Sequence, residues 1–150
     1  MFAVTRYSAR MQFVCDATGG RTWFRLETEA EAEAESAEMR HAVDKYFRRA
    51  HAAARESYRA PLGGPSFEQE IGLKDHIARV SPLFLTLRAD DGAPLATAML
   101  PPGGRNAAAF RTIIVGPGNS DPYAEHADAI EALGAHVGLE LTRETCFPYA

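Results

Sequence analysis

The sequence has few of the residues that mark a disulfide-stapled, metal-binding or membrane-spanning chain. Its two cysteines, Cys15 and Cys146, stand at opposite ends, so neither a disulfide framework nor a paired-cysteine zinc site is expected. No stretch approaches 18 consecutive apolar residues. The first residues also lack the apolar run of a secretory signal. These absences predict a cytoplasmic protein with reduced thiols, no membrane segment, and no bound metal or cofactor.

Lysine is nearly missing as well. Of the 16 basic residues only Lys45 and Lys74 are lysines, and alanine is abundant, which indicates a GC-rich, bacterial genome. The net charge is −4 and the pI about 5.7. Because binding to nucleic-acid phosphates needs a concentrated basic surface, this balance argues against a nucleic-acid partner.

The length and composition predict one globular domain spanning residues 1–150. A chain of 150 residues with 46% apolar and 24% charged residues matches ordinary globular usage. At this size a hydrophobic core forms without staples. We therefore expect a single α+β domain of two layers, with a mostly antiparallel sheet.

The sequence predicts two β-hairpins. Residues 11–17 and 21–27 are rich in aromatic and β-branched residues, with Thr18-Gly19-Gly20 between them as a tight turn. Residues 83–88 and 94–100 form a second pair around an Asp-Gly step. Residues 2–7 are a candidate third strand at the start. Residues 66–81 fit a short helix, a strand, or one of each.

A long helix is expected over about residues 28–60. Thr28 and Glu31 have the spacing of a capping box. Apolar residues then recur at steps of three and four, with acidic residues at the front and arginines at the end. Because such a helix is long for so small a domain, its acidic start projects or frays, or the helix bends. Its large residues, Tyr46, Phe47 and Tyr58, favour a homodimer through this helix.

The segment 110–143 predicts a strand–helix–strand unit. Residues 110–115 read as a buried strand and Asp121-Pro122 as a helix start. Gly138 fits the left-handed position that ends a helix. Residues 139–142 then resume strand-like alternation. If both strands join one sheet, they form a parallel pair.

The loop of this unit is the leading candidate site. A helix N-terminus after a strand collects anions, and Gly116, Gly118, Asn119 and Ser120 would form the cradle. Arg105 and Arg111 flank it as anion clamps. The competing interpretation is a simple tight turn before a helix that Asp121 caps. The His41–Asp44 pair could be half of a metal site, the residues at 125–128 could provide acid–base chemistry, and Cys146 could be a nucleophile. Solvated or structural roles are favoured for all three.

The order of elements from residue 83 is similar to the middle of the acetyl-CoA-dependent N-acyltransferases. In that family a loop between a strand and a helix holds the cofactor pyrophosphate, and Gly116-Pro117-Gly118 falls where that loop would lie. The resemblance implies an acyl-transfer enzyme and rests on topology alone.

Three functions follow from these patterns. The first is a binding or interaction module that self-associates and takes an unknown small molecule. The alternative is a small enzyme of acyltransferase-like topology that binds an anionic ligand or acyl-CoA at 116–120. The third is a small-molecule-binding fold with a pocket between the sheet and the long helix.

Overall fold

The computed structural model describes residues 11–59, 66–102 and 111–146. Within these ranges five strands form one sheet in the order β1-β2-β3-β4-β5, and every neighbouring pair is antiparallel. The strands are β1 (Gln12–Asp16), β2 (Thr22–Arg25), β3 (Leu83–Arg88), β4 (Pro94–Leu100) and β5 (Ile113–Val115). The helices are α2 (Glu29–Met39), α3 (Val43–Ser57), α4 (Ser66–Val80) and α5 (Tyr123–Val137). The α+β class and both hairpins are confirmed.

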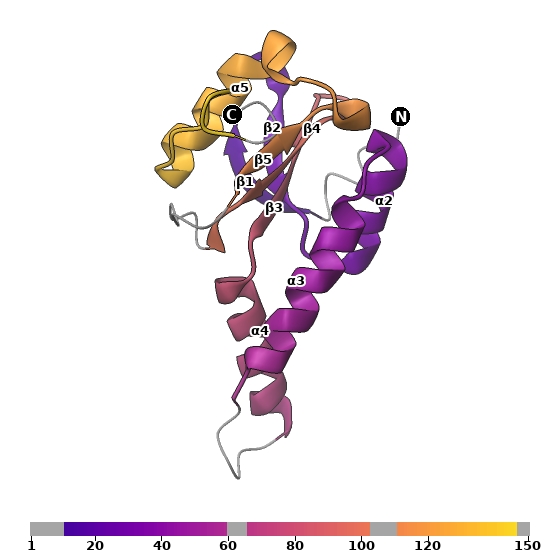
Figure 1. The fold of residues 1–150 in the computed structure, drawn as a ribbon, viewed down its shortest axis with the longest axis vertical. Helices are drawn as coiled ribbons and strands as arrows, with labels where there is room; N and C mark the ends of the chain where they lie inside the picture. The colour runs from indigo at the N-terminus through magenta and orange to yellow at the C-terminus, as the bar shows by residue number, and fades with distance from the viewer. Residues whose placement is uncertain (1–10, 60–65, 103–110, 147–150) are drawn as a thin grey trace.

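Helices cover both faces of this sheet (Figure 1). On one face, Trp23 and Leu85 pack in a core with Leu133 of α5. On the other face, Phe47 of α3 packs on Phe84, with ring centroids 5.3 Å apart. The domain therefore has three layers, where two were expected. The reason is that polar side chains of the central strands lie under α2 and not in solvent, as described below.

The long helix expected over 28–60 is two helices. The capping box of Thr28 and Glu31 is present, but the first helix ends at Arg40, whose backbone is left-handed (φ 56°, ψ 54°). Across the break, the Ser36 hydroxyl donates to the Asp44 carboxylate and accepts from the Asp44 N–H, each at 2.9 Å. This pair of hydrogen bonds compensates for the interrupted helix. Of the two alternatives, bending is the one realised.

Residues 66–80, left open by the sequence, form the single helix α4. It runs beside α3 in the opposite direction, and together they extend beyond the sheet (Figure 1). Tyr58 at the end of α3 lies against His76 of α4, with ring centroids 5.3 Å apart. Of the large residues on which the homodimer prediction rests, Phe47 is buried and Tyr58 is half-buried within the chain, whereas Tyr46 is 47% exposed.

The C-terminal unit is confirmed in its first two elements only. The turn at Gly138 is left-handed (φ 75°), and the N–H groups of Gly138 and Leu139 donate to the Gly134 carbonyl. Residues 139–142 form no strand, so the predicted parallel pair is absent from the described sheet. Leu141 is instead buried against α5. Alternation over four residues was too short to distinguish a strand from a segment that folds back on its own helix.

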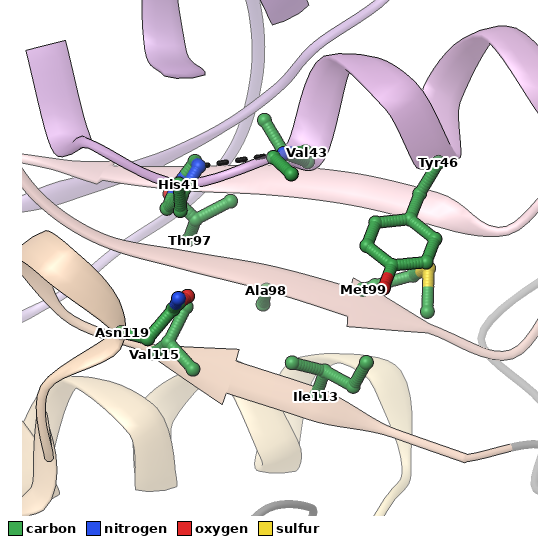
Figure 2. Close-up of a pocket in the computed structure, with 10 residues that line it drawn as sticks. His41, Val43, Tyr46, Thr97, Ala98, Met99, Ile113, Val115 and Asn119 are labelled. Carbon is green, nitrogen blue, oxygen red and sulfur yellow. Dashed lines mark hydrogen bonds between the residues drawn. The ribbon is translucent and has the colours of Figure 1, made fainter. Parts of the chain in front are cut away.

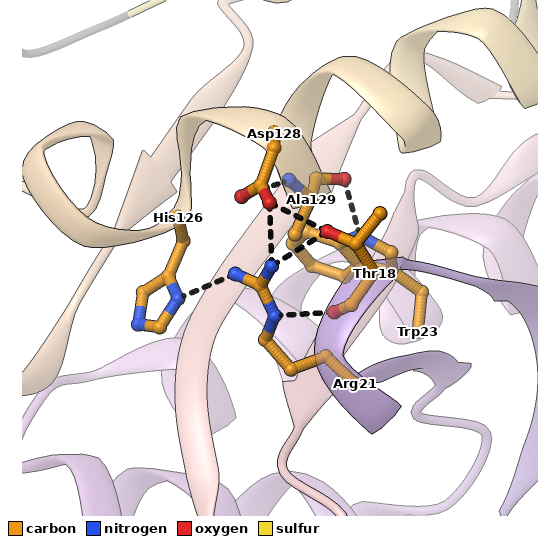
Figure 3. Close-up of polar contacts among 6 residues, drawn as sticks. All are labelled: Thr18, Arg21, Trp23, His126, Asp128 and Ala129. Atoms are coloured by element: carbon orange, nitrogen blue, oxygen red, sulfur yellow. Dashed lines mark hydrogen bonds and ion pairs between the residues drawn. The ribbon is translucent and has the colours of Figure 1, made fainter.

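A polar cluster fixes α5 to the turn between β1 and β2 (Figure 3). The Arg21 guanidinium donates to Asp128 at 2.7 Å and to the Thr18 hydroxyl at 2.9 Å. It also lies 3.1 Å from Nδ1 of His126, whose backbone departs from helical geometry. His126 and Asp128 at the start of α5 therefore have a structural role, which is one of the two interpretations of residues 125–128 given above.

Histidine burial predicts that the protein loses stability in mild acid. Burial lowers the pKa of His126, assisted by Arg21 and opposed by Glu125 and Asp128. The pKa values of His41 and His51 are lowered as well, with burial again the main cause. A group whose folded pKa lies below its unfolded value stabilises the fold above about pH 6.5, and this contribution is lost as the pH falls.

The check is the melting temperature measured between pH 7.5 and pH 5, with a lower value expected at the acid end. The His126→Gln variant should show a flatter dependence, while His136→Gln, at an exposed site in α5, serves as the control. A melting temperature that rises towards pH 5 would contradict this account.

Candidate functional site

A cavity of about 340 Å³ opens between the α2–α3 junction and strands β4 and β5. Its polar residues gather at one end, where His41 and Thr97 face Asn119 of the 116–120 loop (Figure 2). Its apolar residues line the rest: Val43, Tyr46, Met99, Ile113 and Val115. We refer to this space as the His41 cavity. It has the size and the mixed lining of a small-molecule site.

Directly behind the polar end lies a buried ion pair. Glu35 of α2 and Arg88 of β3 are 0% and 1% exposed, and Nη2 of Arg88 lies 2.5 Å from Oε1 of Glu35. The other nitrogens of Arg88 donate to the Thr86 hydroxyl and to the Gly92 carbonyl of the β3–β4 turn. Every nitrogen of the guanidinium thus has an acceptor, which is what a buried cation requires.

Thr97 connects this ion pair to the cavity. Its hydroxyl donates to Oε2 of Glu35 at 2.5 Å and lies 2.8 Å from Nε2 of His41. A hydroxyl that donates to the carboxylate accepts from the imidazole, so Nε2 of His41 carries the proton. Its other nitrogen, Nδ1, then accepts from the Val43 N–H at 3.4 Å. The sequence Arg88–Glu35–Thr97–His41 therefore runs from the core to the cavity wall.

The electrostatics of His41 agree with this assignment. Burial lowers the pKa of His41, so its imidazole is neutral at pH 7. Burial raises the pKa of Glu35, while Arg88 and the hydroxyls of Thr97 and Thr86 oppose that change. The cavity therefore presents a neutral, hydrogen-bonding end, with the two buried charges compensated behind it.

Thr97→Val tests the link between the ion pair and the cavity. Valine has nearly the same shape, but it removes the donor to Glu35 and the acceptor for His41. Leaving buried polar groups unsatisfied costs roughly 1–3 kcal/mol of unfolding free energy, measurable by urea titration. Thr22→Val, at a half-buried hydroxyl of β2, is the matched control. Equal losses of unfolding free energy in the two variants would show that the contacts of Thr97 with Glu35 and His41 contribute no more stability than those of an ordinary strand threonine.

Of the residues of the predicted loop site, only Asn119 is among those that line this cavity. Gly116, Gly118 and Ser120 form the turn around η3 (Pro117–Asn119). The N–H groups of Gly116, Asn119 and Ser120 all donate to carbonyls inside the loop. Asp121 accepts from the Tyr123 N–H at 2.8 Å. These groups are therefore already engaged, as in the tight-turn interpretation.

The two predicted clamps, Arg105 and Arg111, stay a prediction. Arg105 lies outside the described residues, and Arg111 is exposed just before β5. The structure places Arg40 beside the loop: its Nη2 is 3.9 Å from the position that a Cβ on Gly118 would take. Binding of an anion at 116–120 stays a prediction.

The sequence interpretation missed the residues that form the wall of the cavity. Glu35 was counted among the acids that complement a helix dipole, and Thr86, Arg88 and Thr97 were assigned no role. One signal was available: Glu35 lies three residues after Ala32 and four before Met39, both buried. That spacing places the carboxylate in the middle of the buried stripe of α2.

His41 and Asp44, considered as half of a metal site, have separate roles. His41 contacts Thr97, and Asp44 contacts Ser36 and Arg48. Among residues 11–59, 66–102 and 111–146, no three His, Cys, Asp or Glu side chains are grouped to hold a metal ion. No helix within the same ranges has the length and apolar character needed to cross a bilayer.

The fold and the cavity thus define a small α+β domain whose sheet is covered on both faces and borders a cavity with a polar end. Comparison with known proteins gave no matching family model, no similar curated protein and no similar solved structure.

Proposed function

We propose that the protein is a cytoplasmic binding module whose ligand is a small, neutral, mostly apolar molecule held in the His41 cavity. The supporting observation is the cavity itself: about 340 Å³, apolar over most of its lining, with hydrogen-bonding groups at one end. Sites with this combination are typical of small-molecule recognition, because apolar contacts supply affinity and a few polar groups fix orientation.

The chemistry of the cavity wall narrows the ligand. His41 is neutral and Glu35 is paired with Arg88, so none of the residues that line the polar end carries an uncompensated charge. A charged ligand would lose hydration there without gaining a partner of opposite charge. A hydroxyl or carbonyl group facing Asn119 and His41, with an aromatic or aliphatic body against Met99 and Ile113, fits the lining.

Neutral probes of this kind test the proposal. Benzyl alcohol, indole and 1-hexanol at millimolar concentration should shift the NMR signals of the Met99 and Ile113 methyl groups. Val115→Phe, which fills the cavity from β5, should abolish the shifts. The control is Val80→Phe, at an exposed position of α4. If none of the three probes moves either methyl signal, the proposal fails.

A second candidate function is the acyltransferase-like enzyme. That resemblance rests on the order strand, strand, strand, helix, strand from residue 83, of which β3, β4, β5 and α5 supply the first four elements. Arg40 next to Gly118 offers a cation for a phosphate. A ligand at 100 times its dissociation constant adds about 2.7 kcal/mol of stability. Acetyl-CoA at millimolar concentration should then raise the melting temperature, and Arg40→Gln should reduce the increase. An unchanged melting temperature removes this candidate.

Self-association through the helices is part of the proposal. Phe67 and Ile71 lie one turn apart on α4 and are 63% and 56% exposed. A second copy would bury them against the equivalent pair, in the helix-packing manner of bundles. Light scattering should give twice the chain mass, and the Phe67→Ser/Ile71→Ser double variant should give the monomer. A monomeric wild-type mass rules the dimer out.

A further inference from the structure

A second cavity, of about 610 Å³, lies on the other side of α3, where α3 and α4 leave the sheet. Its apolar wall comes from Leu26 after β2, from Leu73, Ile77 and Ala78 of α4, and from Pro82. Its polar wall comes from β2, α3 and α4, and contains Arg25, His51, Arg55 and Lys74. We call it the His51 cavity. It shares no lining residue with the His41 cavity.

The cations of the His51 cavity are available to a ligand. Arg25 is half-buried, and Nη2 donates to the Ala78 carbonyl at 3.1 Å, which joins β2 to α4. Burial lowers the pKa of Arg25, since its charge is poorly hydrated, and the charge of Glu27 opposes this change. No described acid forms an ion pair with Arg55 or Lys74. The guanidinium groups of Arg25 and Arg55 match the planar, two-oxygen face of a carboxylate or phosphate.

His51 lies in the same cavity as two of these cations, Arg25 and Arg55. Its ring stacks on Phe47 with centroids 3.9 Å apart. Burial lowers its pKa, and the positive charges of Arg25 and Arg55 lower it further. The two arginines come from different elements and line the same cavity as the imidazole. Glu27 and Glu70 also line the cavity, and they leave the three cations in excess by one charge.

We propose that the His51 cavity binds an amphiphilic organic anion, with its phosphate or carboxylate group between Arg25 and Arg55 and its apolar body against Leu73 and Ile77. This site is separate from the His41 cavity. It takes an anionic ligand, whereas the His41 cavity takes a neutral one. The large volume and the mixed lining accommodate both parts of such a molecule.

The experiment uses phenyl phosphate and benzoate as anionic probes, with phenol as the neutral match and inorganic phosphate as the anion without an apolar body. Binding is followed by the NMR signal of the His51 ring. Phenyl phosphate, benzoate or both should bind, and an anion beside the imidazole should raise the pKa of His51. Phenol and inorganic phosphate should each bind more weakly than the better of the two. Which anion binds more tightly decides between a phosphate and a carboxylate ligand.

Charge variants separate this proposal from a non-specific effect. Arg55→Gln and Lys74→Gln should each weaken binding about tenfold, equivalent to about 1.4 kcal/mol. Arg49→Gln, an exposed arginine of the same helix that does not line the cavity, should leave it unchanged. Val115→Phe should not affect it either, which distinguishes this site from the His41 cavity. The proposal is overturned if neither anion shifts the His51 signal, or if Arg49→Gln weakens binding as much as Arg55→Gln.

Discussion

Replacing Glu35 by alanine should lower the unfolding free energy by about 3–5 kcal/mol, because it leaves the guanidinium of Arg88 buried without its counter-charge. Arg88 is 1% exposed, so water does not take the place of the missing carboxylate without rearrangement. The same substitution removes the acceptor of the Thr97 hydroxyl. A domain of this size has roughly 5–15 kcal/mol of total stability. The variant should therefore melt roughly 6–20 °C below the wild type.

The neighbouring acid Glu38 is the matched control. Its carboxylate lies 3.8 Å from Nη1 of Arg88, but it is 42% exposed and can be replaced by water. Glu38→Ala should cost less than about 1 kcal/mol, as surface ion pairs do. The double variant Glu35→Leu/Arg88→Met removes both charges and should recover much of the loss. Equal losses for Glu35→Ala and Glu38→Ala would show that the buried pair is not the origin of the effect.

The sheet hairpins were predictable because their signals are local. The Asp91-Gly92 step needs a positive φ, and Gly92 has φ 86° between β3 and β4. The aromatic strands around Thr18-Gly19-Gly20 follow the same logic. Burial on both faces was not predictable from these strands, because Thr86 and Arg88 read as the solvent side of an alternating pattern. Their burial depends on a carboxylate some 50 positions away in the chain.

The break between α2 and α3 was hidden for a related reason. Residues 39–44 contain neither glycine nor proline, so no breaker residue marks the end of the first helix. The turn is stabilised by Ser36 and Asp44, which meet only once the chain has turned. His41 reaches Thr97 because of this turn, so the cavity could not be derived from a continuous helix. The candidate loop 116–120 was located correctly as a turn, but only Asn119 among its residues faces the cavity.

Trp23 of β2 holds helix α5 against the sheet. The indole is fully buried between β2 and α5, and Nε1 donates to the Ala129 carbonyl at 2.9 Å (Figure 3). Helix α5 follows directly from the loop that carries Asn119. The seating of α5 on Trp23 therefore helps to fix where that loop lies relative to β4 and β5.

Trp23→Ala should lower the unfolding free energy by about 3–5 kcal/mol, since it leaves a large cavity under α5. Because the chain has a single tryptophan, unfolding is best followed by far-ultraviolet circular dichroism in urea. Trp23→Phe keeps most of the apolar volume and loses one hydrogen bond, so it should cost less, about 1–2 kcal/mol. Phe13→Ala, at a 57% exposed position of β1, should stay within about 0.5 kcal/mol of the wild type. If Trp23→Ala cost no more than Phe13→Ala, α5 would be held mainly by the Arg21–Asp128 cluster.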